Sequence, residues 1–198
     1  MSYNHKITDL KFHMDKLVPE NVCKYFIKFY NENAVHANKE TSYKYDSKKH
    51  EYDNFNCINL SQLSRIDNKF KKPFDLARLY ISIVITNYVL HIRKNICPTF
   101  NDGLINSTSN VRILQYKKGQ CIKDHSDVDT LNRASCTLNL NESYKGGEFR
   151  FFSGKVKCSF KTGDAMLFPA EPIWIHGTEP ITEGVRYAIN CFLHQSID

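Results

Sequence analysis

Two short stretches of the chain place a histidine and an aspartate one residue apart, and such a pair could bind a metal ion. They are His13-Met14-Asp15 and His125-Ser126-Asp127. With eight histidines in 198 residues, a tripeptide of this kind also occurs by chance. The spacing alone therefore does not identify a site, and the surroundings of each pair must separate them.

Only the second pair lies among short segments typical of β-strands. In a strand, His125 and Asp127 would project from one face while Ser126 faces the other way. A third ligand from a neighbouring strand would complete a metal site, and His176 in the apolar run IWIHG is the candidate. Two imidazoles and a carboxylate form the facial triad of non-haem Fe(II) oxygenases, which leaves positions for a co-substrate and O2. The first pair has no such companion, so we interpret it as exposed polar surface.

The region that would position these ligands, residues 111–195, is a succession of short β-branched or aromatic runs. Glycines and Pro172 separate the runs, as is usual for turns between strands. About eight strands in so short a stretch predict a double-stranded β-helix, the two-sheet jelly roll. The runs are VRILQYK, QCIKDHSD, ASCTLNLN, GGEFRFF, VKCSF, DAMLFPA, IWIHG and RYAINCFLH.

The first part of the chain has a different pattern of apolar and charged residues. From Pro19 to about Asn31 and from Phe74 to about Lys94, the pattern of apolar residues predicts two helices, the second buried on most sides. Residues 38–57, between the helices, are charged and rich in tyrosine. This composition indicates a mobile surface loop or irregular strands.

These elements define the expected architecture. Residues 96–110 are full of turn formers and form the connection to the strands. We predict a mainly β (α+β) fold in one domain over residues 1–198. A helical support region at 1–110 would brace the jelly-roll core at 111–195.

Composition narrows the class of protein. Hydrophobic content of 41% and aromatic content of 13% are typical of a globular chain. The net charge of +6 is a mild basic excess, compatible with an acidic partner. Seven cysteines without a C-x-x-C pair indicate neither a zinc site nor a disulfide framework. No leader or membrane-spanning run is present, so we expect a cytoplasmic protein without a membrane partner.

Four motifs follow one another around the second pair. They are Y-x-x-G at Tyr116, GGEFxF from Gly146, KTGDAMLF from Lys161, and HG at His176 followed by Pro180, Gly184, Arg186 and Tyr187. In this order they resemble the prolyl 4-hydroxylase-like branch of the 2-oxoglutarate/Fe(II)-dependent dioxygenase superfamily. The resemblance covers about residues 111–195, and the ordered set is far more specific than any one motif.

The resemblance implies roles for individual residues. His125, Asp127 and His176 would hold Fe(II). Arg186, ten residues after His176, stands where the family places a basic residue against the distal carboxylate of 2-oxoglutarate. A guanidinium suits that task because it meets a carboxylate with two parallel hydrogen bonds. Tyr116 could donate its hydroxyl to the same co-substrate, or it could be a core tyrosine.

Four further positions are candidates or departures from the family pattern. The family's prolyl hydroxylases often carry a tyrosine where this chain has Asn139, which can still donate a hydrogen bond to the co-substrate with a shorter reach. Asn190 shares the strand face of Arg186 and could be another polar contact. Trp174 would share the face of His176, as a wall of the substrate pocket or as core. Arg133 follows the metal pair after a short insert, so the lid over the substrate pocket would be small here.

The resemblance also implies the reaction. The expected enzyme uses Fe(II), 2-oxoglutarate and O2, with ascorbate in support. It hydroxylates a residue of a protein or peptide, with proline as the leading prediction, and it releases succinate and CO2. A free amino acid or another small molecule is the alternative substrate. Nucleic-acid demethylation is disfavoured because Phe192 stands where those relatives carry a second arginine. A catalytically silent jelly-roll binding module is disfavoured because no ligand is missing.

Overall fold

Strands dominate the part of the chain that the computed structural model describes, residues 5–43 and 51–196. They are β1 (Phe12–Met14), β2 (Asn38–Tyr43), β3 (Glu51–Asn59), β4 (Ser107–Tyr116), β5 (Asn132–Asn139), β6 (Tyr144–Gly146), β7 (Phe149–Phe151), β8 (Val156–Cys158), β9 (Ala165–Pro169), β10 (His176–Thr178), β11 (Ile181–Gly184) and β12 (Arg186–His194). The α-helices are α1 (Glu20–Glu32), α2 (Leu60–Leu63) and α3 (Lys71–Asn95), and short 3-10 turns lie at Ile7–Leu10, Ala34–His36, Asn68–Phe70 and Asp102–Ile105.

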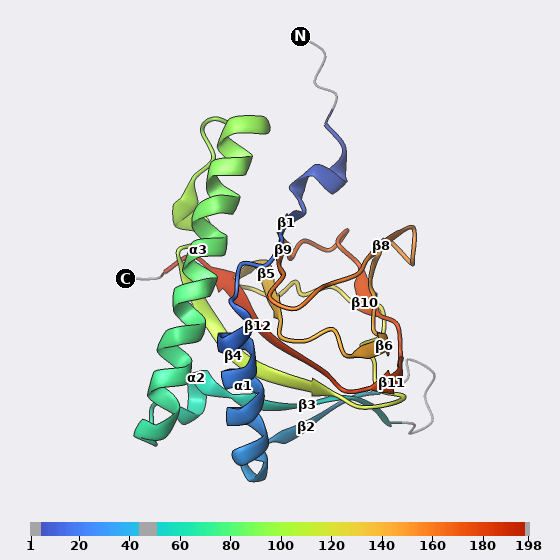
Figure 1. Ribbon diagram of the computed structural model, residues 1–198. Helices are drawn as coiled ribbons and strands as arrows, with labels where there is room; N and C mark the ends of the chain where they lie inside the picture. Colours follow the sequence, from blue (N-terminus) through green and yellow to red (C-terminus); the bar gives the residue numbers. More distant parts are fainter. Residues whose placement is uncertain (1–4, 44–50, 197–198) are drawn as a thin grey trace.

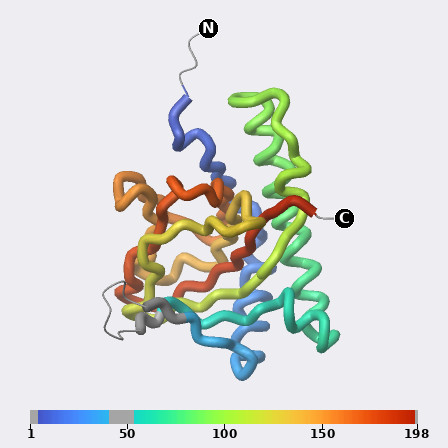
Figure 2. The backbone as a smooth tube through the Cα atoms, turned by 180° about the vertical axis from the view of Figure 1, so that it is seen from behind, coloured from blue at the N-terminus to red at the C-terminus, as the bar shows by residue number. Residues whose placement is uncertain are grey.

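The strands form the two layers of a double-stranded β-helix, as predicted. A seven-stranded antiparallel sheet has the order β1-β9-β5-β12-β4-β3-β2. The opposite layer consists of β10-β7-β8 and the two-stranded β11-β6 (Figure 1). Helices α1 and α3 cover the other face of the seven-stranded sheet, and Figure 2 shows the yellow-to-red jelly-roll segments beside the green α3 from behind.

The two long helices lie where their apolar spacing predicts them. In α1, Cys23, Phe26 and Tyr30 recur at helical spacing and are buried. Helix α3 begins at Lys71, about one turn earlier than predicted, because Pro73 fits a first turn, where its missing N–H loses no partner. Among the described residues, no helix is both long and apolar enough to cross a membrane.

The N-terminal region contributes more than helical support. β1 pairs with β9 at one edge of the seven-stranded sheet, while β2 and β3 extend the other edge beside β4. The surface-loop interpretation of residues 38–57 is therefore wrong for the described part, and the irregular-strand alternative holds, with a bulge between Glu40 and Thr41. Residues 44–50 lie outside the described part. β4 begins at Ser107, inside the stretch predicted as a connection.

Within residues 111–195, every predicted run except one contains a strand. The exception is QCIKDHSD, which carries only an isolated bridge between His125 and His176. This polar segment forms no regular strand and instead contacts β10 through that bridge. The prediction also missed β6 and β11, whose pairing begins at the glycine corner. Gly146 and Gly147 have φ of +78° and +71°, and a Cβ on Gly146 would lie 2.1 Å from the carbonyl oxygen of Pro180, so this corner requires glycine.

An aromatic cluster fills the space between the two layers next to β10. It consists of Phe149, Phe151, Phe160, Met166, Phe168 and Trp174, all buried. The ring of Phe149 stacks on that of His176 at 5.8 Å, and Phe168 meets the same imidazole edge-on at 4.7 Å. These contacts fix the plane of His176 before any ligand binds.

Candidate active site

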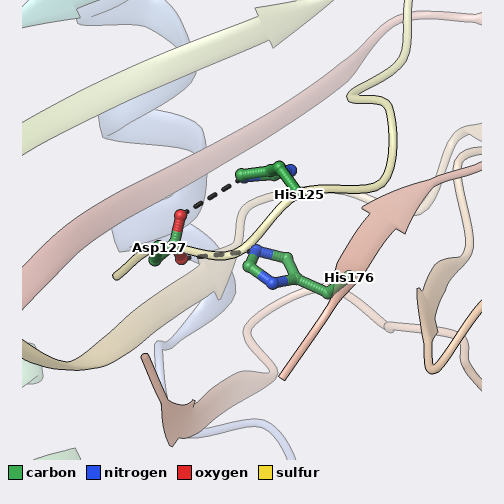
Figure 3. A group of neighbouring side chains, drawn as sticks. All are labelled: His125, Asp127 and His176. Carbon is green, nitrogen blue, oxygen red and sulfur yellow. Dashed lines mark ion pairs between the residues drawn. The ribbon is translucent and has the colours of Figure 1, made fainter. Parts of the chain in front are cut away.

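Three side chains from two distant parts of the sequence, His125 and Asp127 from one and His176 from the other, lie close together (Figure 3). His125 Nε2 lies 3.2 Å from Asp127 Oδ1, and His176 Nε2 lies 3.3 Å from Asp127 Oδ2. One ligand atom from each residue lies within 4.8 Å of the others. Three such atoms around one point are the arrangement that a single metal ion needs.

The backbone positions the two histidines without a regular strand. His125 N donates to the carbonyl of His176 at 2.9 Å, and His176 N donates back to His125 at 2.8 Å. The expectation that His125 and Asp127 share the face of a strand is thus wrong in its mechanism, although the two side chains do converge. The reciprocal bridge brings them to His176.

Asp127 is held from the side of β5. The Ser135 hydroxyl donates to Asp127 Oδ2, and Asn132 Nδ2 donates to the backbone carbonyl of Asp127 at 3.1 Å. Ser135 was missed from the sequence, although Ser135, Thr137 and Asn139 alternate along β5 and so were a detectable polar face.

The second nitrogen of each imidazole fixes where its proton sits. His125 Nδ1 lies 2.8 Å from the carbonyl oxygen of Lys123, and His176 Nδ1 lies 3.0 Å from that of Trp174. A carbonyl only accepts hydrogen bonds, so Nδ1 of each ring carries a proton and donates it, and Nε2 is the nitrogen that faces Asp127. Either a proton on Nε2 or a metal ion between the three groups can complete these contacts with the carboxylate. The donor set therefore fits a divalent metal.

The electrostatics of the group agree with a cation site. Burial by itself would raise the pKa of Asp127, but hydrogen bonds from His125 and His176 outweigh it and hold that pKa far below its usual range. Burial likewise opposes charge on His125, yet the contact with Asp127 raises the pKa of this histidine above its ordinary value. The carboxylate is thus ionised and attracts positive charge.

The first H-x-D pair has a companion after all, which corrects the prediction. His13 Nε2 lies 3.3 Å from Asp164 Oδ2 and 3.4 Å from Asp15 Oδ1. Asp164 is buried, and its oxygens accept hydrogen bonds from the backbone N–H groups of Lys16 and Lys161. It therefore fastens β1 to the turn before β9. Asp15, 91% exposed, does fit the predicted polar surface.

The metal-ligand candidates open into a cavity of about 430 Å³ between the layers. Arg186 lines the same cavity and is 1% exposed. Its Nε donates to Asn139 Oδ1 at 3.1 Å and its Nη1 to the carbonyl of Gly147 at 3.3 Å, both neutral acceptors. Among the described residues, no carboxylate pairs with this buried cation. Because an unpaired buried charge is costly, the guanidinium fits an anionic ligand such as a carboxylate of 2-oxoglutarate.

Aromatic rings surround the guanidinium of Arg186. Its carbon lies 5.3 Å from the centre of the Tyr116 ring, and the rings of Tyr144, Phe149 and Phe160 lie within 6.0 Å. Tyr116 also lines the cavity. Burial raises the pKa of Tyr116 to about 12, against the opposing effect of Arg186, so its hydroxyl stays protonated and able to donate.

The two predicted asparagines have different surroundings. Asn139 is fully buried and is not among the lining residues of the cavity; it accepts from Arg186 and donates to the carbonyls of Asn141 and Lys161. Its observed contact is with the arginine. Asn190 does line the cavity, and its Oδ1 accepts a hydrogen bond from Arg112 Nε at 3.1 Å.

The structure does not bring Trp174 or Arg133 to the cavity. Trp174 precedes β10 and packs against Phe151 and Phe152 at 5.6 and 5.2 Å, so core packing, the alternative reading, describes its position. Arg133 is exposed on β5, where its Nη1 donates to the carbonyl of Asn132. Strand alternation misplaced Trp174 because the strand begins only at His176.

Comparison with known proteins shows what this chain is similar to. Residues 111–194 match the 2OG-Fe(II) oxygenase superfamily. No curated protein sequence matches the chain. Among solved structures, a prolyl hydroxylase from Trichoplax adhaerens, in complex with a hypoxia inducible factor oxygen degradation domain peptide fragment, superposes with a TM-score of 0.69 at 12% identity, covering 95% of this chain and 84% of that one.

Two further structures have the same fold. The Pseudomonas putida prolyl-4-hydroxylase gives a TM-score of 0.60 at 13% identity, over 96% of this chain and 97% of that one. The viral collagen prolyl hydroxylase from Paramecium Bursaria Chlorella virus-1, in its 2OG complex, gives 0.55 at 15% identity, over 95% and 97%. The chain thus has the fold of these prolyl hydroxylases, and its residues 111–194 match the model of the 2OG-Fe(II) oxygenase superfamily.

Proposed function

We propose that the chain hydroxylates a residue of a protein or peptide, with proline as the leading target, at a metal held by His125, Asp127 and His176. The observation that carries this proposal is the convergence of three ligand atoms within 4.8 Å, in the cavity that also contains the unpaired Arg186. When bound together, Fe(II) and 2-oxoglutarate supply O2 activation, with decarboxylation to succinate and CO2 and transfer of one oxygen atom to the substrate.

In that reaction, each group of the site would have its own task. The Lys123 and Trp174 carbonyls orient the imidazoles, and Ser135 orients the carboxylate of Asp127. Arg186 would bind the distal carboxylate of the co-substrate, and the Tyr116 hydroxyl could donate to the same group. The aromatic cluster excludes water around the reacting atoms.

The choice of a peptide substrate is supported by the fold and by the shape of the site. The Trichoplax adhaerens relative was solved with a peptide fragment bound. The insert between Asp127 and β5 is short, and the side chain of His125 is 38% exposed, so the site is accessible from outside on the side of His125. A free amino acid remains the alternative substrate.

We also propose a cytoplasmic location, supported by seven free thiols, among them Cys136 and Cys191, which are opposite each other in the β5–β12 register.

The test incubates the purified chain with Fe(II), ascorbate, 2-oxoglutarate and a library of proline-containing peptides. The conversion of 2-oxoglutarate is measured as succinate, and mass spectrometry detects peptides that have gained one oxygen. Asp127→Ala and His176→Ala should abolish both signals, because each removes one of three ligands. His13→Ala is the matched control from the other H-x-D pair and should retain them. Equal loss in His13→Ala would contradict the choice of site.

Arg186→Ala should raise the concentration of 2-oxoglutarate required for half-maximal turnover far more than the concentration of iron. Hydrogen bonds to a charged group contribute about 1.5–3 kcal/mol, which corresponds to about a 10- to 100-fold change. An unchanged 2-oxoglutarate requirement would exclude this arginine from co-substrate binding.

A further inference from the structure

The cavity contains a second guanidinium, Arg112, that the proposed chemistry does not use. It lies on β4 opposite Asn190 of β12, and Arg186 lies opposite Tyr116 four residue pairs further along the same two strands. At about 3.3 Å per residue, the two arginine levels are about 13 Å apart along the ladder. Both side chains line one cavity, so they can bind two different groups.

The side chain of Arg112 is fixed in place before any ligand arrives. Its Nε donates to Asn190 Oδ1 at 3.1 Å. Its guanidinium carbon lies 5.5 Å from the centre of the Phe192 ring and 5.7 Å from that of Phe55. All three neighbours also line the cavity, and the side chain of Arg112 is only 14% exposed. A ligand therefore meets a pre-oriented cation between two flat rings.

The donors at the end of Arg112 are available. The nearest carboxylate, Glu40, lies 3.8 Å from Nη1, beyond hydrogen-bonding distance, and its side chain is 43% exposed. Among the described residues, neither Nη1 nor Nη2 makes a hydrogen bond. Arg150 differs: its Nε and Nη1 donate to Asp124 and Glu179 at 2.8 and 3.1 Å. Both side chains are partly buried, at 19% and 14% exposure, but Arg150 is hydrogen-bonded to two carboxylates, whereas Arg112 has one long ion pair with Glu40 and unused Nη donors.

We propose, resting on the function proposed above, that Arg112 binds a carboxylate of the substrate next to the position that is oxidised. With Nε occupied by Asn190, the remaining edge presents Nη1 and Nη2, which match the two oxygens of a planar carboxylate. Phe55 and Phe192 border the slot in which such a flat group fits. The net charge of +6 also favours an acidic substrate. The carboxylate could belong to an aspartate or glutamate beside the target proline, or to a free amino acid.

The test measures binding without turnover. The full chain, loaded with Mn(II) and 2-oxoglutarate under anaerobic conditions, is titrated into fluorescein-labelled heptapeptide pools with a central proline. Paired pools differ only in having Glu or Gln at one flanking position, tested in turn, and binding is followed by fluorescence anisotropy. Unlabelled free proline is added as a competitor, which separates the two sources of the carboxylate.

We expect at least one Glu pool to bind about 10- to 100-fold more tightly than its Gln partner, the range for hydrogen bonds to a charged group. Arg112→Gln should bring this ratio to about one, Arg112→Lys should leave a reduced preference, and Arg150→Gln, the control, should keep the full ratio. Displacement of both pools by free proline in the wild type, lost in Arg112→Gln, would identify the small molecule as the source.

Three results would overturn the proposal. They are equal binding of the Glu and Gln pools in every pair together with no displacement by proline, an undiminished Glu preference in Arg112→Gln, or no binding of any probe. Glu40→Gln provides a second variant should Arg112→Gln fail to fold: removing the competing carboxylate should strengthen the Glu preference, and an unchanged ratio would count against the site. A Glu preference without oxygen incorporation into any substrate would refute the proposed function and leave the binding site standing. Oxygen incorporation with neither a Glu preference nor displacement by proline would do the reverse.

Discussion

A histidine and an aspartate one residue apart become a site here through the contacts of their other atoms. In the second pair, His125 Nδ1 is tied to the carbonyl of Lys123, and Asp127 is held by Ser135. In the first pair, His13 faces Asp164, whose oxygens already accept backbone N–H donors. The same tripeptide therefore contributes to a cluster of candidate metal ligands in one place and to a structural contact in the other.

Ser135→Ala should lower the metal affinity by about 10- to 100-fold, because the partner that orients a ligating carboxylate is lost. Anaerobic calorimetric titration with Mn(II) measures the affinity. Thr137→Ala is the matched control, since Thr137 lines the cavity two residues along the same strand and has no recorded contact with Asp127. A similar drop in both variants would mean that the cavity, rather than the Ser135 hydroxyl, is responsible.

Asn139→Asp should weaken 2-oxoglutarate binding while leaving metal affinity in place. The new carboxylate has the shape of the amide and would lie 3.1 Å from Arg186 Nε, so it would neutralise the cation that the co-substrate needs. We expect about a 10-fold rise in the dissociation constant, from loss of a charge-assisted contact. Asn190→Asp, a substitution of the same kind in the same cavity next to Arg112, is the control. Unaltered binding in Asn139→Asp would show that Arg186 does not receive the co-substrate.

The site residues differ in how far the sequence could predict them. His125, Asp127, His176 and Arg186 were identified because motif order restricts their positions, and the structure brings them to one cavity. Strand alternation made Trp174 a candidate for either the pocket wall or the core, and the structure places it in the core, before the strand that begins at His176. Arg112 carried no motif, and only the β4–β12 register reveals that it faces the cavity beside Asn190.

At the scale of elements, short segments and turns hold the ligands. Apolar runs predicted most jelly-roll strands, because alternation and turn residues are local properties. The reciprocal bridge between His125 and His176 depends on two segments about fifty residues apart, which no local pattern encodes. The same reason explains why β1 escaped prediction and why strands over 38–57 were only one of two alternatives: β1 pairs with β9 and β3 pairs with β4, both far away in the sequence.

Asp164→Ala should lower the free energy of unfolding by about 1–3 kcal/mol, because the backbone N–H groups of Lys16 and Lys161 would lose their buried acceptor. Urea denaturation measures this change. The matched control is Asp15→Ala in the same cluster, where exposure of 91% predicts a change within about 0.5 kcal/mol. Loss of Mn(II) binding in Asp164→Ala without loss of stability would instead make this cluster a metal site.

At the scale of the whole molecule, the two layers leave a cavity that a metal and a keto acid would fill together. The seven-stranded sheet is buried on its helix side by one continuous core, from Val18 to Leu193. Its other face supplies Arg112, Tyr116 and Arg186 to the cavity. Because the sheet that lines the cavity also packs on the main core, ligand binding in the cavity should raise the unfolding temperature of the whole chain.

Mn(II) and 2-oxoglutarate together should raise the unfolding temperature by about 5–10 °C. Ligand at about 100 times its dissociation constant stabilises by about 2.7 kcal/mol, and a chain of this size shifts by about 2–4 °C per kcal/mol. Differential scanning calorimetry of the wild type gives the shift. In Arg186→Ala, the metal contribution should persist while the 2-oxoglutarate contribution disappears. A full shift in that variant would contradict the role of the arginine.

The central claim is that one metal ion sits between His125, Asp127 and His176. Anomalous diffraction from a crystal of the full chain with Mn(II) and 2-oxoglutarate tests it most directly. The account predicts one strong manganese peak at bonding distance from Nε2 of both imidazoles and from an Asp127 oxygen, with a carboxylate of the keto acid against Arg186. A peak at His13 and Asp164 instead, or no peak at the three ligands, would contradict it.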